Sequence, residues 1–445
     1  MSFPQQVKNS LLQIISDMSS NPNSFFLNPK SDFSRKRKLP FASLIHLMLS
    51  MEAGTIRDEL LDYFSLQHDT LSNSAFFQQR NKLSQTVFPH IFYSFDAMYP
   101  HSLYKGKYLL LAADGSSFTF TRNPLDEASY YQPTDKSSNG YNQIHVVPLF
   151  HLLDKRYLDC VIQPVRRKNE FQALCDLIDR HPYASGQIPV FIADRGFHSL
   201  NVFAHAIEHN AYFIIRATDR KMNNLLNADL LKIKEKDNFD IWITRFLTRS
   251  RSKKKRQHPE RAEQYKVICK DVSFDYLIPG RQNEYEINLR VLRFKISENG
   301  YENIITNLPL DDFPSDEIKY LYNLRWGIET SFRELKHVIG ARNFHSKNRK
   351  YIEMEIWARL ILYNYCSIIT GHVVVAQKNN NKHIYQVNYS VAYKACHYFF
   401  RLHLGESPPD VEGLIGKNIL PIRPNRNYAR QHRFRVPVSF TYRFK

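Results

Sequence analysis

Cysteine, acidic residues and long apolar runs are all scarce in this sequence, and each shortage excludes a class of protein. The 445 residues include five cysteines, an odd number without CxxC spacing, so a disulfide-stapled framework and a zinc finger are excluded. No uncharged apolar run reaches the roughly 18 residues that a membrane span requires. The N-terminus lacks the basic and apolar regions of a signal peptide. We therefore expect a cytoplasmic protein with reduced thiols and no membrane partner.

Motifs for nucleotide-driven and zinc-dependent chemistry are missing as well. The sequence contains no GxxxxGK[ST] phosphate loop, so no nucleotide cofactor is indicated. None of its 18 histidines lies in an HExxH pattern, which excludes the common zinc-peptidase arrangement.

Positive charge is what the chain has in excess. Lys and Arg total 61 against 43 Asp and Glu, which gives a formal net charge of +18 and a pI near 9.5. Basic runs at 35–38, at 249–256 and in the tail 423–445 favour a long surface that contacts phosphates. Nucleic acid is therefore the leading partner. The candidate phosphate contacts in the second run are Lys253, Lys254, Lys255 and Arg256.

The pattern of apolar residues divides the chain into five regions. Short amphipathic patterns over 1–103 predict a helical N-terminal domain that binds DNA, with a plain helical cap over the next domain as the alternative. Strand and helix patterns over 104–217 predict a mixed sheet with βαβ crossovers. Short alternating strands over 218–309 predict a β-rich insertion. Helical patterns resume over 310–372, and 373–445 forms a basic C-terminal region.

Two of the predicted strands end in an aspartate followed by a turn. Asp114 closes "LLLAADGS" and Asp194 closes "VFIADRGF". A carboxylate at the end of a buried strand is oriented by the sheet and only partly solvated, which suits metal ligation. Either aspartate alone could equally be a turn or capping residue.

A third carboxylate lies on the helix predicted over 314–340. At about 100° per residue, Tyr322, Arg325, Glu329 and Lys336 fall within an arc of roughly 60°, beside an apolar stripe that faces the core. A salt-bridged solvent face is the alternative, because Arg325 and Glu329 form an i,i+4 pair. The alignment of a phenol and an ammonium with that pair favours a functional face.

These residues resemble the signature of a known family. Tyr322, two residues, Arg325, three residues, Glu329, six residues and Lys336 match the pattern of the bacterial insertion-sequence-four transposases, a branch of the DDE transposases. The resemblance covers residues 107–369 well, the N-terminal helices moderately and the basic tail poorly.

The resemblance implies an α/β fold: a ribonuclease-H-like catalytic core with a β-rich insertion, between a helical N-terminal domain and a helical, basic C-terminal region. It implies that Asp114, Asp194 and Glu329 are the catalytic residues. They would hold two Mg²⁺ ions, which Mn²⁺ could replace.

The implied reaction is Mg²⁺-dependent cutting of an insertion sequence at its ends, through a hairpin intermediate, and joining of those ends to target DNA. The implied partners are double-stranded DNA, as terminal inverted repeats and as target, and a second copy of the chain in a homodimer. A bacterial, nucleoid-associated location follows.

Further residues receive roles from the same resemblance. Tyr322, Arg325, Lys336 and Arg333 would contact phosphates beside the cut. Tyr301 and Trp242 are candidate stacking platforms for a flipped base, with ordinary packing as the alternative for each.

Two other functions stay open at this point. One is a catalytically inactive DNA-binding protein derived from such a transposase, and the other is a ribonuclease-H-like nuclease that cuts without joining. Retention of Asp114, Asp194, Glu329 and Lys336 favours an active enzyme.

Overall fold

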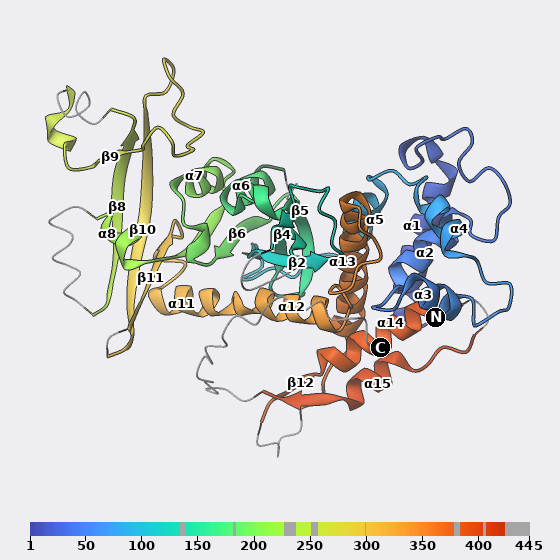
Figure 1. The fold of residues 1–445 in the computed structure, drawn as a ribbon. Helices are drawn as coiled ribbons and strands as arrows, with labels where there is room; N and C mark the ends of the chain where they lie inside the picture. The colour runs from blue at the N-terminus through green and yellow to red at the C-terminus, as the bar shows by residue number, and fades with distance from the viewer. Residues whose placement is uncertain are drawn as a thin grey trace.

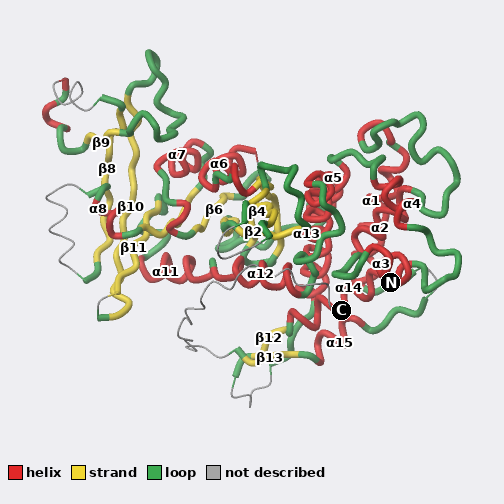
Figure 2. Tube along the Cα trace, in the orientation of Figure 1, coloured by secondary structure: helices red, strands yellow, loops and turns green. Residues whose placement is uncertain are grey.

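One large mixed sheet, with helices on both faces and a helical bundle at one end, organises the molecule (Figures 1 and 2). The architecture of this computed structural model is mixed α/β, as the sequence predicts. No helix among the described residues is long and apolar enough to cross a membrane. The structure describes residues 1–133, 139–180, 184–226, 237–250, 257–298, 300–377, 383–403 and 406–422.

Eleven strands of this sheet lie within the described residues. They are β1 (Tyr108–Ala113), β2 (Ser116–Phe120), β3 (Tyr130–Tyr131), β4 (Tyr141–His151), β5 (Arg156–Pro164), β6 (Ile188–Ala193), β7 (Tyr212–Ala217), β8 (Phe239–Thr248), β9 (Tyr265–Val267), β10 (Glu284–Ser297) and β11 (Gly300–Thr306). Their order is β2-β4-β1-β6-β7-β11-β10-β8-β9, and β3 and β5 also pair with β4. β4 is antiparallel to β1, whereas β6 is parallel to β1 and β7 is parallel to β6. The two edges of β1 therefore face strands of opposite direction.

Helices cover both faces of the central strands (Figure 1). The helices on one face are α6 (Glu170–Arg180) and α7 (Leu200–Glu208), and those on the other are α11 (Ser315–Leu324), α12 (Trp326–His337) and α13 (Arg349–His372). Successive strand residues point to opposite faces. Leu109 and Leu111 of β1 accordingly pack with α6 and α7, whereas Leu110 and Ala112 pack with the helices of the other face. This double burial explains why β1 is continuously apolar.

The N-terminal helices share a hydrophobic core with the C-terminal helices. The remaining elements are α1 (Phe3–Ser20), α2 (Phe41–Ser50), α3 (Ile56–Tyr63), α4 (Asn73–Arg80), α5 (Val87–Asp96), α8 (Asp219–Asn223), α14 (Tyr389–Arg401), α15 (Val411–Lys417), the 3₁₀ helices η1 (Pro22–Ser24), η2 (Val165–Arg167), η3 (Arg195–Phe197) and η5 (Pro259–Arg261), and the paired strands β12 (Tyr385–Val387) and β13 (Ile419–Pro421).

Lys8 of α1 donates to the carbonyls of Phe399 (3.0 Å) and Leu402 (2.6 Å), where α14 ends. Helix α1 is therefore held against the end of α14.

The strands between 218 and 309 continue the central sheet. β11 pairs antiparallel with β7, and β10 and β8 follow outward from it. In Figures 1 and 2 these long strands stand at the end of the molecule opposite the N-terminal helices.

The prediction of one long helix over 314–340 is wrong in its detail. Two helices, α11 and α12, meet at Arg325. At the junction the Arg325 amide bonds to the Tyr322 carbonyl (3.1 Å) and the Ile328 amide to the Arg325 carbonyl (3.0 Å), which is the tighter i to i−3 pattern. α12 then ends before Gly340, whose φ of +86° favours glycine and closes the helix.

A buried charge network ties the N-terminal helices to α13. His345 bonds Glu355 through its backbone amide (2.9 Å) and through Nδ1 (3.0 Å), and its Nε2 lies 3.1 Å from the Gly54 carbonyl. Arg80 lies 3.6 Å from Glu355, and Glu59 lies 3.8 Å from His345. Burial alone would lower the pKa of His345, but the nearby Glu355 carboxylate raises it above its usual value.

We predict that Glu355→Ala lowers the free energy of unfolding by about 3–5 kcal/mol, because it leaves buried positive groups without their partner. Urea unfolding measures this change. The control is Glu353→Ala on the same helix. Its carboxylate is 31% exposed and lies 3.8 Å from Arg349. Its loss should cost less than about 1 kcal/mol. Equal effects of the two substitutions would contradict the assignment.

Candidate active site

Asp114 and Asp194 leave the sheet side by side. β1 and β6 pair in parallel with Ala113 opposite Ala193, so both strands end at the same level. Neighbouring strands lie about 4.8 Å apart. The aspartate that follows each strand is therefore carried to the same edge of the sheet. The sequence patterns predict the two strand ends, and the family resemblance implies that they meet.

Short turns fix both carboxylates. Oδ1 of Asp114 accepts a bond from the Gly115 amide (2.8 Å). Asp194 caps η3, and its Oδ1 accepts from the Gly196 amide (2.7 Å). Each side chain is thus oriented by the backbone that follows it.

Glu329 reaches this edge from the helices. It lies in the first turn of α12, which packs against β1. Arg325, 6% exposed, donates from Nη2 to Oε1 of Glu329 at 2.9 Å. A buried guanidinium therefore lies directly beside the third carboxylate.

The electrostatics of Asp114 show that its carboxylate lies in the fields of Asp194 and Glu329. The pKa of Asp114 is raised to about 6: burial is the main cause, the negative charges of Asp194 and Glu329 add to it, and the Gly115 amide and Arg325 oppose it. Such an excess of negative potential is what a divalent cation offsets. Carboxylate oxygens from three elements are also the hard donors that Mg²⁺ prefers. The donor set therefore fits a site for a divalent cation.

The three carboxylates are spaced more widely than the ligands of a single closed ion site. Among the described residues, one group of possible metal ligands has its ligand atoms within 4.8 Å of one another. It consists of His101, His151 and Asp154. The ligand atoms of the three carboxylates therefore do not all lie within that distance of one another in this structure.

Lys336 is anchored next to Asp114. Its Nζ donates to Ser116 Oγ (2.7 Å) and to the Ser117 carbonyl (3.1 Å), and it lies 4.7 Å from the centre of the Phe118 ring. Burial lowers the pKa of Lys336, and the charge of Asp114 opposes this shift. The ammonium group thus sits beside the turn that carries the first carboxylate.

The ring of Tyr322 packs against the guanidinium of Arg325. The side chain is 4% exposed, and within the described residues its hydroxyl makes no hydrogen bond of normal geometry. The Arg325 guanidinium lies 5.6 Å from the centre of its ring. Burial raises the pKa of Tyr322, and the positive charge of Arg325 opposes the shift. In this structure the hydroxyl does not reach the surface.

The remaining predicted phosphate contacts are Arg333 and the four residues of the basic run. Arg333 is exposed on α12. Lys253, Lys254, Lys255 and Arg256 lie outside the described residues.

The two flipped-base candidates lie on outer strands. Tyr301 is on β11, where its hydroxyl donates to Asp237 (2.7 Å) and the Arg293 guanidinium lies 3.8 Å from the centre of its ring. Trp242, 47% exposed, is on β8. The strand order puts β11 three strands and β8 five strands from β1, or about 14 and 24 Å at about 4.8 Å per strand. A base stacked on either ring would lie well away from Asp114.

Sequence reasoning missed three residues near the carboxylates. Trp326 follows Arg325 directly, is 55% exposed and has its ring centre 5.4 Å from the Arg325 guanidinium. Its position inside the Tyr-Arg-Glu-Lys signature was a usable signal. His145 and Glu170 approach the Gly115 backbone but belong to no motif.

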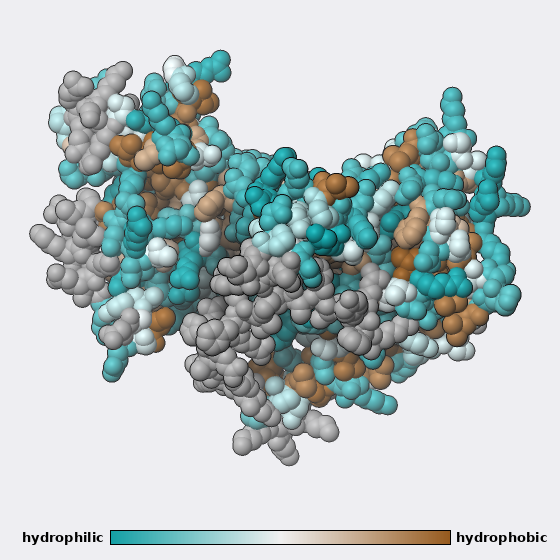
Figure 3. All heavy atoms as spheres, in the orientation of Figure 1, coloured by the Kyte–Doolittle hydropathy of each residue, from teal (hydrophilic) through white to brown (hydrophobic). Residues whose placement is uncertain are grey.

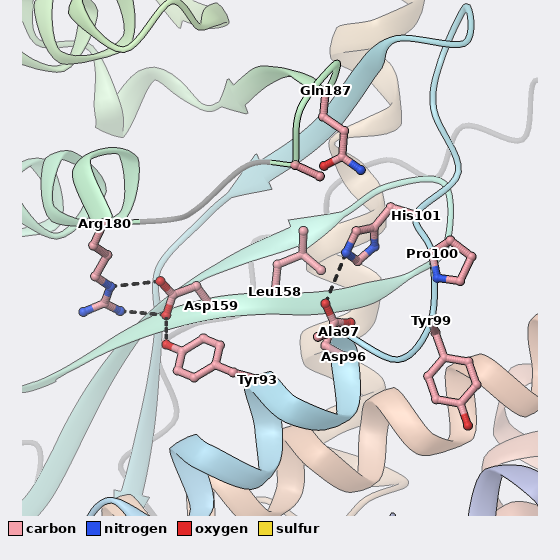
Figure 4. Close-up of a pocket in the computed structure, with 11 residues that line it drawn as sticks. Tyr93, Asp96, Ala97, Tyr99, Pro100, His101, Leu158, Asp159, Arg180 and Gln187 are labelled. Atoms are coloured by element: carbon pink, nitrogen blue, oxygen red, sulfur yellow. Dashed lines mark hydrogen bonds and ion pairs between the residues drawn. The ribbon is translucent and has the colours of Figure 1, made fainter. Parts of the chain in front are cut away.

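A cavity of about 770 Å³ lies between α5, β5 and the end of α6 (Figure 4). Its charged side chains are paired with each other. Arg180 donates to both oxygens of Asp159 (2.9 and 2.7 Å), Tyr93 donates to the same carboxylate, and His101 lies 3.2 Å from Asp96. This internal pairing leaves no uncompensated charge to select a ligand.

The group formed by His101, His151 and Asp154 already contains a cation. Arg156 Nη2 lies 2.6 Å from Nδ1 of His101 and 3.3 Å from Oδ2 of Asp154, and it bonds two backbone carbonyls as well. The guanidinium supplies the positive charge that a metal ion would bring, so we assign no metal there.

The chain was compared with known families and structures. The family model described as "Transposase DDE domain" matches residues 105–365, more than half of the chain and all three carboxylates. No curated protein matches the chain. Among solved structures, the cryo-EM structure of the piggyBac transposase synaptic complex with hairpin DNA is similar, with a TM-score of 0.44 and 11% identity over 96% of this chain and 87% of that chain.

We predict that Asp114→Asn stabilises the metal-free protein at neutral pH. The folded-state pKa of Asp114 is raised from 3.8 to about 6. The charged carboxylate therefore lowers the free energy of unfolding, and this loss is absent below about pH 4 and fully present above about pH 6. Removal of the charge should add about 1–3 kcal/mol at pH 7.5, since one pKa unit corresponds to about 1.4 kcal/mol.

Unfolding by urea at pH 7.5 and pH 4, without divalent ions, measures this gain. The exposed Asp311, changed to Asn, is the control and should leave stability nearly unchanged at both values. A variant no more stable than the parent at pH 7.5 would contradict the assignment of a strained carboxylate.

Proposed function

Because the chain belongs to the transposase DDE domain family, we propose that it is a DNA transposase that cuts the ends of its own insertion sequence and joins them to target DNA. The observation that carries the proposal is the in-register ending of β1 and β6, which presents Asp114 and Asp194 together beside Glu329. The spacing of Tyr322, Arg325, Glu329 and Lys336 supports the insertion-sequence-four branch of this family.

We propose that the core is ribonuclease-H-like. Its support is the arrangement of β5, β4, β1, β6 and β7, in which β4 is antiparallel to both β1 and β5 while β6 and β7 run parallel to β1. The strands β8 to β11 would then be the insertion between the second and third carboxylates.

Asp114, Asp194 and Glu329 would hold two Mg²⁺ ions, or Mn²⁺ in their place. Two such ions supply charge neutralisation at the attacking and leaving oxygens of an in-line phosphoryl displacement. The turns after β1 and β6 hold the two aspartates in place, so little reorganisation is needed when the ions bind. Arg325 orients Glu329 through their 2.9 Å contact.

Arg325 and Lys336 would also hold the phosphate next to the cut. Arg325 keeps a buried Nε without a hydrogen-bond partner among the described residues, and a guanidinium can bind a phosphate through two parallel bonds. Lys336 contributes a point charge near Asp114. Arg333, exposed one turn away, would extend the contact along the backbone. Tyr322 would act through Arg325, against which it packs.

The partner would be double-stranded DNA, first as terminal inverted repeats and then as target. The formal charge of +18 supports a polyanionic partner. In the space-filling view the molecule is hollowed between the insertion strands and the N-terminal helices, and this face is mainly hydrophilic (Figure 3). A hairpin intermediate, a homodimer in the DNA complex and a location at the bacterial nucleoid complete the proposal.

We predict that Asp114→Ala, Asp194→Ala and Glu329→Ala each reduce strand cleavage by about 100-fold or more, the scale on which the loss of one electrostatic stabiliser acts. DNA binding should persist, because phosphate contacts come from basic residues. The assay mixes the protein with a DNA end from the flanking inverted repeat, Mg²⁺ and a target plasmid. Asp316→Ala, an exposed carboxylate in the first turn of α11, is the control.

The products of this assay separate the possible functions. Cleavage followed by joining supports a transposase, cleavage without joining a nuclease, and binding alone an inactive derivative. Undiminished cleavage by the three variants would reject the assigned site.

The phosphate contact of Lys336 has its own test. The logarithm of the DNA affinity should fall linearly with the logarithm of salt concentration, with a slope of about −0.9 per phosphate contact. Lys336→Met should reduce the magnitude of the slope by about one unit, whereas Lys336→Arg should keep it. Fluorescence anisotropy at several salt concentrations measures both. Equal slopes for the parent and the methionine variant would exclude the contact.

A further inference from the structure

The Gly115 backbone, directly after Asp114, is approached closely by two side chains from other elements. A Cβ atom at Gly115 would lie 2.6 Å from His145 Nε2 on β4 and 2.6 Å from Glu170 Oε1 at the start of α6. A side chain at position 115 would therefore displace His145 or Glu170 from its present place.

His145 and Glu170 also contact each other. His145 Nε2 lies 2.8 Å from Glu170 Oε1, with side-chain exposures of 3% and 29%. The other ring nitrogen, Nδ1, lies 3.0 Å from Ser117 Oγ. β2 and β4 pair with Ser117 opposite His145, so the sheet fixes this contact. The imidazole thus links the residues after Asp114 to the N-terminal turn of α6.

A side chain from another helix also contacts this segment, residues 115–117. Lys336 of α12 bonds Ser116 and the Ser117 carbonyl. α12 also carries Glu329. The segment 115–117 therefore lies between the helix of the third carboxylate on one side and the His145–Glu170 pair on the other. The segment thus connects the turn of Asp114 to the helix of Glu329.

We propose that His145 and Glu170 are positioning residues that hold the Asp114 turn at the spacing from Asp194 and Glu329 that a pair of divalent ions requires. This inference rests on the proposed function, because it assumes that the three carboxylates bind metal. Groups that orient metal ligands affect affinity strongly although they do not touch the ion.

A comparable histidine elsewhere in the molecule provides a matched control. His205 on α7 is equally enclosed, with Nδ1 2.7 Å from Asp179 and Nε2 2.8 Å from Asp275. Its contacts lie on α6, α7 and the loop at 275 rather than on the Asp114 turn. Loss of His205 should therefore remove a buried histidine and its two polar contacts without moving Asp114.

Calorimetric titration of the full chain with Mn²⁺ alone tests the proposal without relying on catalysis. His145→Gln, Glu170→Ala and Gly115→Ala should each weaken Mn²⁺ binding by about 10-fold or more, as loss of supporting groups does at other metal sites. His205→Gln should bind Mn²⁺ as the parent does. In single-turnover cleavage, the rate of the first three variants should recover at high Mn²⁺, whereas their DNA affinity should stay unchanged.

Unchanged Mn²⁺ affinity in folded His145→Gln and Glu170→Ala would overturn the proposal. Glu170→Gln changes only the charge of a partly exposed side chain in the first turn of α6, so it serves if the other variants fail to fold. Parental Mn²⁺ affinity in this variant would also overturn the proposal. Asp114→Asn distinguishes failure of the proposed function from failure of the role proposed for His145 and Glu170. If Asp114→Asn also binds Mn²⁺ as the parent does, the proposed function fails. If Asp114→Asn binds Mn²⁺ more weakly, only the role of His145 and Glu170 is rejected.

Discussion

The parallel, in-register pairing of β1 with β6 is the constraint on which the site depends. Since Ala113 lies opposite Ala193, the two strands deliver Asp114 and Asp194 to one edge at the same level. Both strands are buried between two layers of helices, so a shift in register would disrupt close packing on both faces. The distance between the two aspartates is thus set by the core rather than by the loops that carry them.

This arrangement brings negatively charged side chains together at a partly buried edge of the sheet, where water solvates them poorly. Burial and two neighbouring carboxylates raise the pKa of Asp114. Arg325 and Lys336 offset part of that charge, and both are themselves held in place, Arg325 by Glu329 and Lys336 by the strand after Asp114. A fold that keeps like charges together in this way stores energy that binding of a cation releases. Binding of the proposed metal ions would therefore come at the expense of metal-free stability.

The elements of the site that could be predicted from sequence are those with a local pattern. Apolar runs that end in aspartate predicted Asp114 and Asp194 at strand ends, and fixed spacing predicted Arg325 next to Glu329. The break at Arg325 could not be predicted, because helical periodicity continues through a single tightened turn. His145 and Glu170 reach Gly115 only through the pairing of β2 with β4 and the start of α6. Contacts made by such long-range pairing leave no spacing signal in the chain.

Diffraction from crystals soaked in Mn²⁺ and recorded at the manganese absorption edge tests the central claim most directly. The account predicts two anomalous peaks about 4 Å apart, bounded by Asp114, Asp194 and Glu329. Manganese bound elsewhere, with no peak among these three carboxylates, would contradict it.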